Sequence, residues 1–366
     1  MLPTCVSSTS QSPFRDHPAL YVCVRSGQLR RRRAGCTKDD ATSTGRKWPI
    51  CDLAAALGAG SSDPTMTTPG PVLPTSVQDA PRPPAWLPAG RTLVVPDLGE
   101  LFVRDSNDQA GDVKPAVLLL HGWGATADVN FAQVYAELAK AYRVIALDHR
   151  GHGRGLRSEA RFTLEDCADD AARLLEVLAV ERAVILGYSM GGPIALLLAH
   201  RHPSLVGALV LEATAMEFHE MVRERVLWHG LTIAEAILRH GGARGTVERL
   251  LAAAVERAPA SASQRSWVAG ELRRGSMREI LEAGAALRSF DARGFVAEID
   301  VPAVVVVTTR DRLVAPRKQR ALAAALTATV LELEEDHDVP VSVLAAFRNV
   351  TRVAVDIAAK RAGLIS

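Results

Sequence analysis

Beyond residue 90, short apolar runs alternate with amphipathic stretches. The runs Ala116–Leu120 and Ala303–Val307 are apolar throughout, as in strands covered on both faces. In Thr163–Ala179 the apolar residues recur three and four apart, and Thr163 with Asp166 resembles a capping box. This alternation of strands and helices predicts an α/β fold, with a mostly parallel sheet flanked by helices.

The same pattern places the individual elements. An antiparallel opening hairpin is expected at Thr92–Val95 and Leu101–Arg104. The other expected strands are Ala116–Leu120, Arg143–Leu147, Ala183–Leu186, Val206–Leu211, Ala303–Val307 and Val330–Leu333. The expected helices are 128–141, Thr163–Ala179, Met190–His200, Pro316–Leu326 and 341–359.

Residues 215–297 interrupt this alternation. They are rich in Ala, Arg, Leu and Glu and show no convincing strand pattern. We expect several helices here, forming a cap over one end of the sheet. The core of the fold is then expected at residues 91–214 and 298–366.

The first 65 residues differ in composition from the rest. They hold 9 Lys and Arg against 5 Asp and Glu, and they include four of the five cysteines. A disordered tail, a basic targeting segment, and a non-native extension ahead of a translation start at Met66 all fit this composition. Eight prolines between residues 64 and 90 predict an extended linker over residues 66–90.

Composition narrows the class of protein. Hydrophobic residues make up 48% and charged residues 23%, as in a soluble globular protein. The apolar runs are far shorter than the roughly 20 residues of a spanning helix, so no stable membrane insertion is expected. A net charge of +2 gives no sign of a nucleic-acid partner. A lone cysteine in the folded part, Cys167, and the lack of a clear export signal favour the cytoplasm, whereas the oligomeric state stays open.

The strongest chemical signal is Gly187-Tyr188-Ser189-Met190-Gly191. It fits G-x-S-x-G, and it follows an apolar strand and precedes an apolar helix, which is the context this motif requires. A strained strand-to-helix turn would present the Ser189 hydroxyl at the carboxyl edge of the sheet. Ser189 is therefore the predicted nucleophile.

Two further motifs precede this turn, and each directly follows a predicted strand. His121-Gly122-Trp123-Gly124 follows the strand at Ala116–Leu120, and Asp148-His149-Arg150-Gly151-His152-Gly153 follows the next one. Over about residues 92–358 the chain resembles an α/β-hydrolase-fold serine hydrolase of the esterase and lipase type. The resemblance implies that the backbone N–H groups of Trp123 and Met190 form an oxyanion hole, and that His121, His149 and His152 shape the loops.

The family order places the acid and the histidine after the nucleophile. His337, the last histidine in the chain, follows the strand at Val330–Leu333 and is the expected base. Asp311 follows Ala303–Val307 and is the expected acid, although Thr308 and Thr309 stand where the family often has Gly. Glu212, at the end of the preceding strand, is the alternative acid.

Arg310 and Arg312 flank Asp311. The alternative to a role as the acid is therefore that Asp311 only forms an ion pair with one of these arginines.

This arrangement predicts a serine hydrolase that cleaves a carboxylic ester or related acyl bond through an acyl-enzyme, without cofactor or metal. The apolar cap favours a small hydrophobic ester as substrate. Acyl transfer, perhydrolysis and carbon–carbon hydrolysis by the same triad remain alternatives, as does a non-catalytic small-molecule receptor of this fold. The resemblance also implies that hydrolysis of epoxides or haloalkanes is not expected, because family members with those activities carry Asp where this chain has Ser189.

Overall fold

The computed structural model describes residues 21–25, 28–31, 86–107, 114–218 and 262–366. Its centre is a ten-stranded sheet in the order β2-β1-β10-β9-β8-β7-β5-β6-β4-β3. Strands β10 to β6 in this order run parallel, and β4 and β3 add an antiparallel pair at one edge. The strands are β1 (Tyr21–Arg25), β2 (Gln28–Arg31), β3 (Gly90–Val95), β4 (Gly99–Asp105), β5 (Ala116–Leu120), β6 (Arg143–Leu147), β7 (Ala183–Tyr188), β8 (Val206–Glu212), β9 (Ala303–Thr308) and β10 (Thr329–Leu333).

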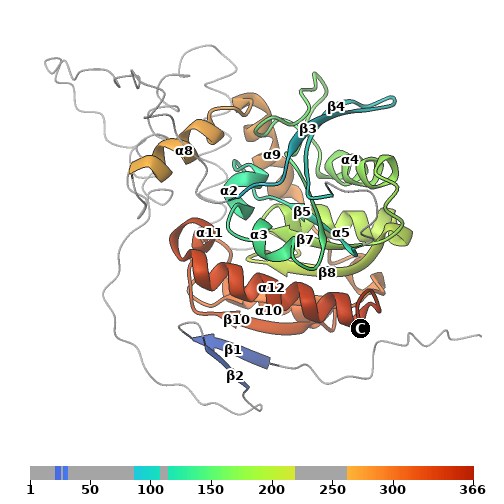
Figure 1. Ribbon diagram of the computed structural model, residues 1–366. Coiled ribbons are helices and arrows are strands. Elements are labelled where there is room, and N and C mark those ends of the chain that lie inside the picture. Colours follow the sequence, from blue (N-terminus) through green and yellow to red (C-terminus); the bar gives the residue numbers. More distant parts are fainter. Residues whose placement is uncertain (1–20, 26–27, 32–85, 108–113, 219–261) are drawn as a thin grey trace, which may run out of the picture.

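Helices cover both faces of this sheet (Figure 1). The helices of the described residues are α2 (Ala127–Phe131), α3 (Tyr135–Leu138), α4 (Leu164–Val177), α5 (Gly191–Arg201), α8 (Ala262–Leu272), α9 (Met277–Ser289), α10 (Pro316–Ala325), α11 (Val339–Ser342) and α12 (Leu344–Arg361), with short 3-10 turns η2 (Pro203–Leu205) and η3 (Val296–Glu298). In β5, Leu118 and Leu120 belong to the core shared with α4 and α5, while Val117 and Leu119 belong to the core shared with α3 and α12. A strand buried on both faces explains why this run is apolar at every position.

The predicted mostly parallel α/β architecture is confirmed, and the predicted strands lie within a residue or two of the observed ones. Two predicted helices are each divided. The stretch 128–141 forms α2 and α3, because the Val134 N–H bonds to Phe131 O in a tighter turn between them. The stretch 341–359 spans the end of the short helix α11 and most of α12, with Val343 between them.

The N-terminal region holds two strands that the pattern did not predict. Strand β1 pairs in parallel with β10, and β2 pairs with β1, so they extend the sheet at that edge (Figure 1). An unpaired strand edge such as that of β10 offers backbone donors and acceptors to a further strand, even one from a segment without a clear hydrophobic period. The rest of residues 1–65, and residues 66–85 of the expected linker, lie outside the described residues.

We refer to residues 215–297 as the insertion. Its described part contains α8, α9 and η3, whereas residues 219–261 lie outside the described residues. The α9 helix begins at the N-cap Ser276, whose side chain accepts a hydrogen bond from the Glu279 N–H. The Ser276 N–H also donates to Gly151 O in the loop after β6, at 2.7 Å. The insertion is therefore tied directly to a loop at the carboxyl edge of the sheet.

Candidate active site

Ser189 occupies the sharp turn between β7 and α5. Its φ angle is +52°, in the left-handed region that costs a non-glycine residue free energy. A Cβ on Gly187 would lie 2.3 Å from Gly191 O, and one on Gly191 would lie 1.9 Å from Leu120 O. Only glycine permits this close approach of the two sides of the turn at Gly187, and of the start of α5 to the end of β5 at Gly191. Hydrogen bonds from the Ser189 N–H to Glu212 O (3.0 Å) and from Thr214 Oγ1 to Ser189 O (2.7 Å) hold the strained residue in place.

The structure brings together the three side chains that the sequence analysis selected. His337 Nε2 lies 3.0 Å from Ser189 Oγ, and His337 Nδ1 lies 2.9 Å from Asp311 Oδ2. A carboxylate oxygen only accepts, so Nδ1 carries the ring proton and Nε2 presents its lone pair to the serine hydroxyl. This is the tautomer that can remove a proton from Ser189.

Asp311 is buried and held by several donors. Its Oδ1 accepts the backbone N–H groups of Leu313 and Val314, both at 2.8 Å, and its Oδ2 accepts the Thr308 hydroxyl at 2.8 Å. Thr308, which departs from the family's usual Gly, thus supplies a donor to the carboxylate. Burial raises the pKa of Asp311, but the neighbouring His337 and these hydrogen bonds outweigh it and leave the pKa below its ordinary value.

The two flanking arginines bond to other carboxylates. Arg310 bonds to Glu334 at 3.0 Å, and Arg312 Nε bonds to Asp336 at 2.6 Å. Each of these arginines thus has a carboxylate partner of its own. The Asp311 carboxylate contacts the His337 imidazole, as expected of the acid in a triad.

His337 follows β10 and is 18% exposed in its side chain. Burial lowers the pKa of its imidazole, but the charge and hydrogen bond of Asp311, together with Asp336 and Asp338, outweigh burial and raise the pKa above its ordinary value. The hydroxyl of Tyr188 donates to His337 O and holds the backbone of this loop. The site thus favours the imidazolium that would form when Ser189 loses its proton.

The two predicted oxyanion donors flank Ser189. Met190 is the N-cap of α5, and its N–H has no hydrogen-bond partner among the residues that the structure describes. Trp123 follows Gly122, and a Cβ on Gly122 would lie 3.2 Å from Ser189 Cβ. The loop carrying Trp123 therefore passes directly beside the nucleophile.

Asn130 holds this loop from α2. Its Oδ1 accepts the Gly122 N–H at 2.8 Å, and both groups are buried. The sequence analysis missed Asn130, since a single asparagine inside a predicted amphipathic helix carries no signal of a contact eight residues earlier.

His121, His149 and His152 form a buried cluster beside the same loop. His121 Nδ1 donates to Gly122 O at 2.8 Å, and its Nε2 accepts the His149 N–H at 2.9 Å. Burial lowers the pKa of His121 to about 4, so its imidazole is neutral near pH 7. These contacts join the loop after β5 to the loop after β6.

Glu212, the alternative acid, has a different environment. Its Oε2 accepts the Thr351 hydroxyl at 3.3 Å, and its Oε1 has no partner within the described part of the chain. Burial raises the pKa of Glu212 to about 8. Of the two candidate acids, the structure places Asp311 against His337.

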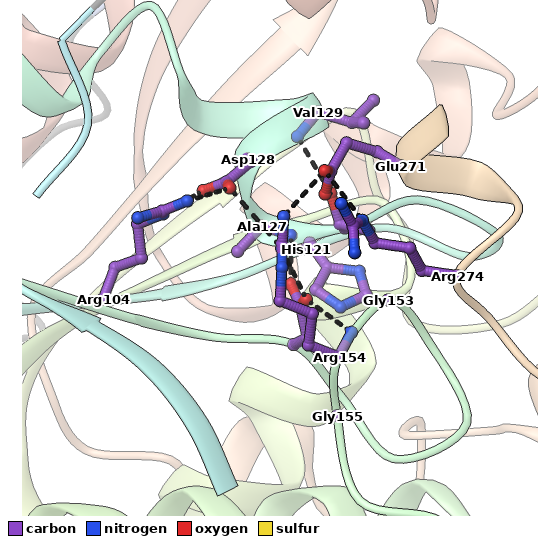
Figure 2. Close-up of polar contacts among 12 residues, drawn as sticks. Arg104, His121, Ala127, Asp128, Val129, Gly153, Arg154, Gly155, Glu271 and Arg274 are labelled. Atoms are coloured by element: carbon purple, nitrogen blue, oxygen red, sulfur yellow. Dashed lines mark hydrogen bonds and ion pairs between the residues drawn. The ribbon is translucent and has the colours of Figure 1, made fainter. Parts of the chain in front are cut away.

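A group of charged side chains connects the insertion to the loops around the site (Figure 2). Arg154 Nη2 bonds to Glu271 of α8 at 2.7 Å, and its Nη1 lies 3.4 Å from Asp148 and 3.6 Å from Asp128. Asp128 also receives two 2.6 Å hydrogen bonds from Arg104 of β4. All three carboxylates are buried, so each depends on these partners.

Two features are absent from the described residues, a group of metal-ligating side chains and a membrane-spanning helix. Among them, no three His, Cys, Asp or Glu side chains are grouped so as to bind a metal ion. None of their helices combines the length and apolar character needed to cross a bilayer.

A buried parallel sheet with a serine on the turn after its central strand β7, and a histidine and an acid after later strands, defines the α/β-hydrolase class. The sequence profile of the α/β hydrolase fold matches residues 115–339. The chain belongs to the α/β-hydrolase-fold family of enzymes.

Among individual relatives, the chain is 35% identical over 222 residues to a pimeloyl-[acyl-carrier protein] methyl ester esterase from Chromobacterium violaceum, covering 59% of this chain and 84% of that one. It is 42% identical over 102 residues to 2-hydroxymuconate semialdehyde hydrolase from Pseudomonas sp., covering 27% and 36% respectively.

Solved structures show the same fold. An enol-lactonase from Burkholderia xenovorans LB400 superposes with a TM-score of 0.56 at 25% identity, covering 73% of this chain and all of the other. An esterase from Exiguobacterium antarcticum superposes with a TM-score of 0.62 at 21% identity and similar coverage, which bears on the fold alone.

Proposed function

We propose that this enzyme hydrolyses carboxylic esters, with Ser189 as nucleophile, His337 as general base and acid, and Asp311 as the group that orients the imidazole. The observation that carries the proposal is the chain of contacts from Ser189 Oγ through His337 to Asp311, at 3.0 and 2.9 Å. A base within hydrogen-bond reach of a hydroxyl, itself oriented by a third group, is the arrangement that activates a serine.

In the first half-reaction Ser189 Oγ bonds to the ester carbonyl carbon while its proton passes to His337 Nε2. The carbonyl oxygen becomes an oxyanion, which the N–H groups of Met190 and Trp123 stabilise. The carbon–oxygen bond to the alcohol then breaks, and His337 donates its proton to the leaving alcohol. In the second half-reaction water attacks the acyl-enzyme, His337 takes a proton from the water, and the carboxylic acid leaves as Ser189 regains its proton.

The substrates to test first are esters with a hydrophobic acyl group and a small alcohol. Support comes from the methyl ester esterases that resemble this chain over more than half of its length. Esters of increasing acyl length, from acetate upward, would map the part of the site that accepts the acyl chain.

Fluorophosphonate labelling followed by peptide mapping tests the nucleophile. We expect one label, on Ser189, and turnover of p-nitrophenyl acetate. Ser189→Ala should lose at least about 1,000-fold in kcat at an unchanged fold, because the covalent path is closed. A folded Ser189→Ala variant with wild-type turnover would refute the assignment of Ser189 as nucleophile. An unlabelled Ser189 together with no turnover of the ester would refute the proposal and favour the receptor alternative.

Carbon–carbon hydrolysis is a second candidate, because the hydrolase of 2-hydroxymuconate semialdehyde shares 42% identity over 102 residues. Incubation with that semialdehyde separates the candidates. Faster turnover of the semialdehyde than of every ester in the panel would favour carbon–carbon cleavage.

A further inference from the structure

Trp123 joins the oxyanion loop to the insertion. Its indole Nε1 donates a 2.6 Å hydrogen bond to the carbonyl oxygen of Ile280 in α9, 157 residues further along the chain. Under the proposed function, on which this inference rests, the backbone N–H of the same residue binds the oxyanion. One residue would thus carry both an anchor to α9 and a donor to the reacting atoms.

Gly284 lies one helical turn after Ile280, on the same side of α9. A Cβ on Gly284 would lie 2.9 Å from Trp123 Cζ2 and 3.3 Å from Cε2, which is closer than side chains approach one another. Glycine inside a helix costs about 0.5–1 kcal/mol relative to alanine. The indole supplies a physical reason for this glycine, since the ring lies against the bare helix backbone.

Gly270 in α8 provides a contrast within the insertion. Among the described residues no atom would lie within 4 Å of a Cβ there, so an added methyl group collides with none of them. The close contact is therefore specific to Gly284. Gly270, which also lies inside a helix of the insertion, has no such contact with the described residues.

We propose that Gly284 is a positioning residue for the oxyanion hole. Together with the Ile280 carbonyl it forms a seat for the Trp123 indole, and this seat fixes the loop from which the Trp123 N–H points to the substrate. The position of α9 is then coupled to the geometry of the hole, so that the insertion contributes to the chemical step as well as to substrate binding.

Two glycine substitutions form a matched pair for the test, measured on a p-nitrophenyl ester. Gly284→Ala should lower kcat about tenfold or more and change KM less than about twofold, because a displaced donor loses part of the 100- to 1,000-fold effect of an oxyanion donor. Gly270→Ala should leave kcat unchanged. A folded Gly284→Ala variant with wild-type kcat would overturn the inference.

Trp123→Phe separates the seat from a general disturbance of α9. Phenylalanine lacks both the Nε1 donor and the Cζ2 atom that meets the added methyl group, so Trp123→Phe alone should lower kcat. In this background Gly284→Ala should cost nothing further. Equal losses in the presence and absence of the indole would overturn the proposal. If Gly284→Ala does not fold, a wild-type kcat in Trp123→Phe would also overturn the proposal.

Labelling of wild-type Ser189 with a fluorophosphonate distinguishes this inference from the proposed function. An unlabelled and inactive wild-type enzyme would refute the function, and the inference with it. A labelled, active wild type with a neutral Gly284→Ala substitution would refute the inference alone. A shift of the Trp123 indole ¹⁵N–¹H signal in Gly284→Ala, absent in Gly270→Ala, is the expected readout that does not depend on turnover.

Discussion

Ser189 Oγ lies 3.0 Å from His337 Nε2, although 148 residues separate the two along the chain. The contact forms because β7 and β10 belong to the same parallel sheet, so that the residues following their carboxyl ends meet at one edge.

The pH dependence of turnover should report on His337. Because Asp311 and the neighbouring carboxylates raise the pKa of His337, kcat/KM should fall on the acid side with a midpoint above pH 6.5, as the base becomes protonated. Asp311→Asn should move this midpoint to lower pH and reduce kcat by about 10⁴-fold, since the amide also favours the wrong tautomer. A pH profile of each variant checks both effects, and an unchanged midpoint in Asp311→Asn would contradict the assignment.

Asn130→Ala should impair the oxyanion loop. The Gly122 N–H loses its acceptor, and an unpaired buried donor costs about 1–3 kcal/mol of stability. We expect kcat to fall more than KM changes, because Gly122 precedes Trp123 in the loop. Asn349→Ala, on an exposed position of α12, is the control and should alter neither kcat nor Tm. Equal behaviour of the two alanine variants would exclude a role for Asn130.

Glu212 should make the free energy of unfolding fall as the pH rises from about 4.5 to about 8. Its pKa is about 8 in the folded chain and near 4.5 when unfolded, so the folded state retains a proton that the unfolded state releases. The contribution to stability is then complete below pH 4.5 and is lost as the pH rises to about 8. Glu212→Gln, which mimics the neutral acid, should raise Tm at pH 9 by at least about 2–4 °C and have little effect at pH 4. Thermal unfolding at both pH values is the measurement. If Glu212→Gln keeps the wild-type dependence of Tm on pH, Glu212 is not protonated in the folded chain.

Glu271→Ala should loosen the attachment of α8. Arg154, Arg274 and Thr126 all lose their partner at this buried carboxylate. We expect a loss of about 1–3 kcal/mol and faster proteolysis within the insertion than in the sheet. Glu176→Ala removes an exposed ion pair with Arg173 and should cost less than about 1 kcal/mol. Limited proteolysis of the two variants side by side decides whether the buried contact has the larger effect.

The sequence predicted what depends on local pattern. The parallel strands follow from apolar runs, and the turn at Ser189 follows from G-x-S-x-G between a strand and a helix. The strands and this turn are visible within about ten residues of sequence. Asp311 and His337 could be selected because the order in the resembled family places an acid and a histidine after late strands, and each is the first suitable side chain there.

The features that escaped prediction depend on contacts between distant residues. The Trp123 indole meets α9 157 residues away, and Arg154 meets Glu271 117 residues away. No periodicity links such positions, because their distance is set by where α8 and α9 contact the loops after β5 and β6. The pairing of β1 with β10 escaped for the same reason, since it joins residues 309 positions apart.

The order of the strands also has a consequence for synthesis. Strand β7 and Ser189 leave the ribosome well before β9 and β10, which are followed by Asp311 and His337. In the sheet β9 lies beside β8, and β10 lies beside β9. Under the proposed function, a nascent chain that stops short of residue 337 contains the nucleophile without its base. Hydrolytic activity would then appear only after the stretch from β9 to His337 has been added.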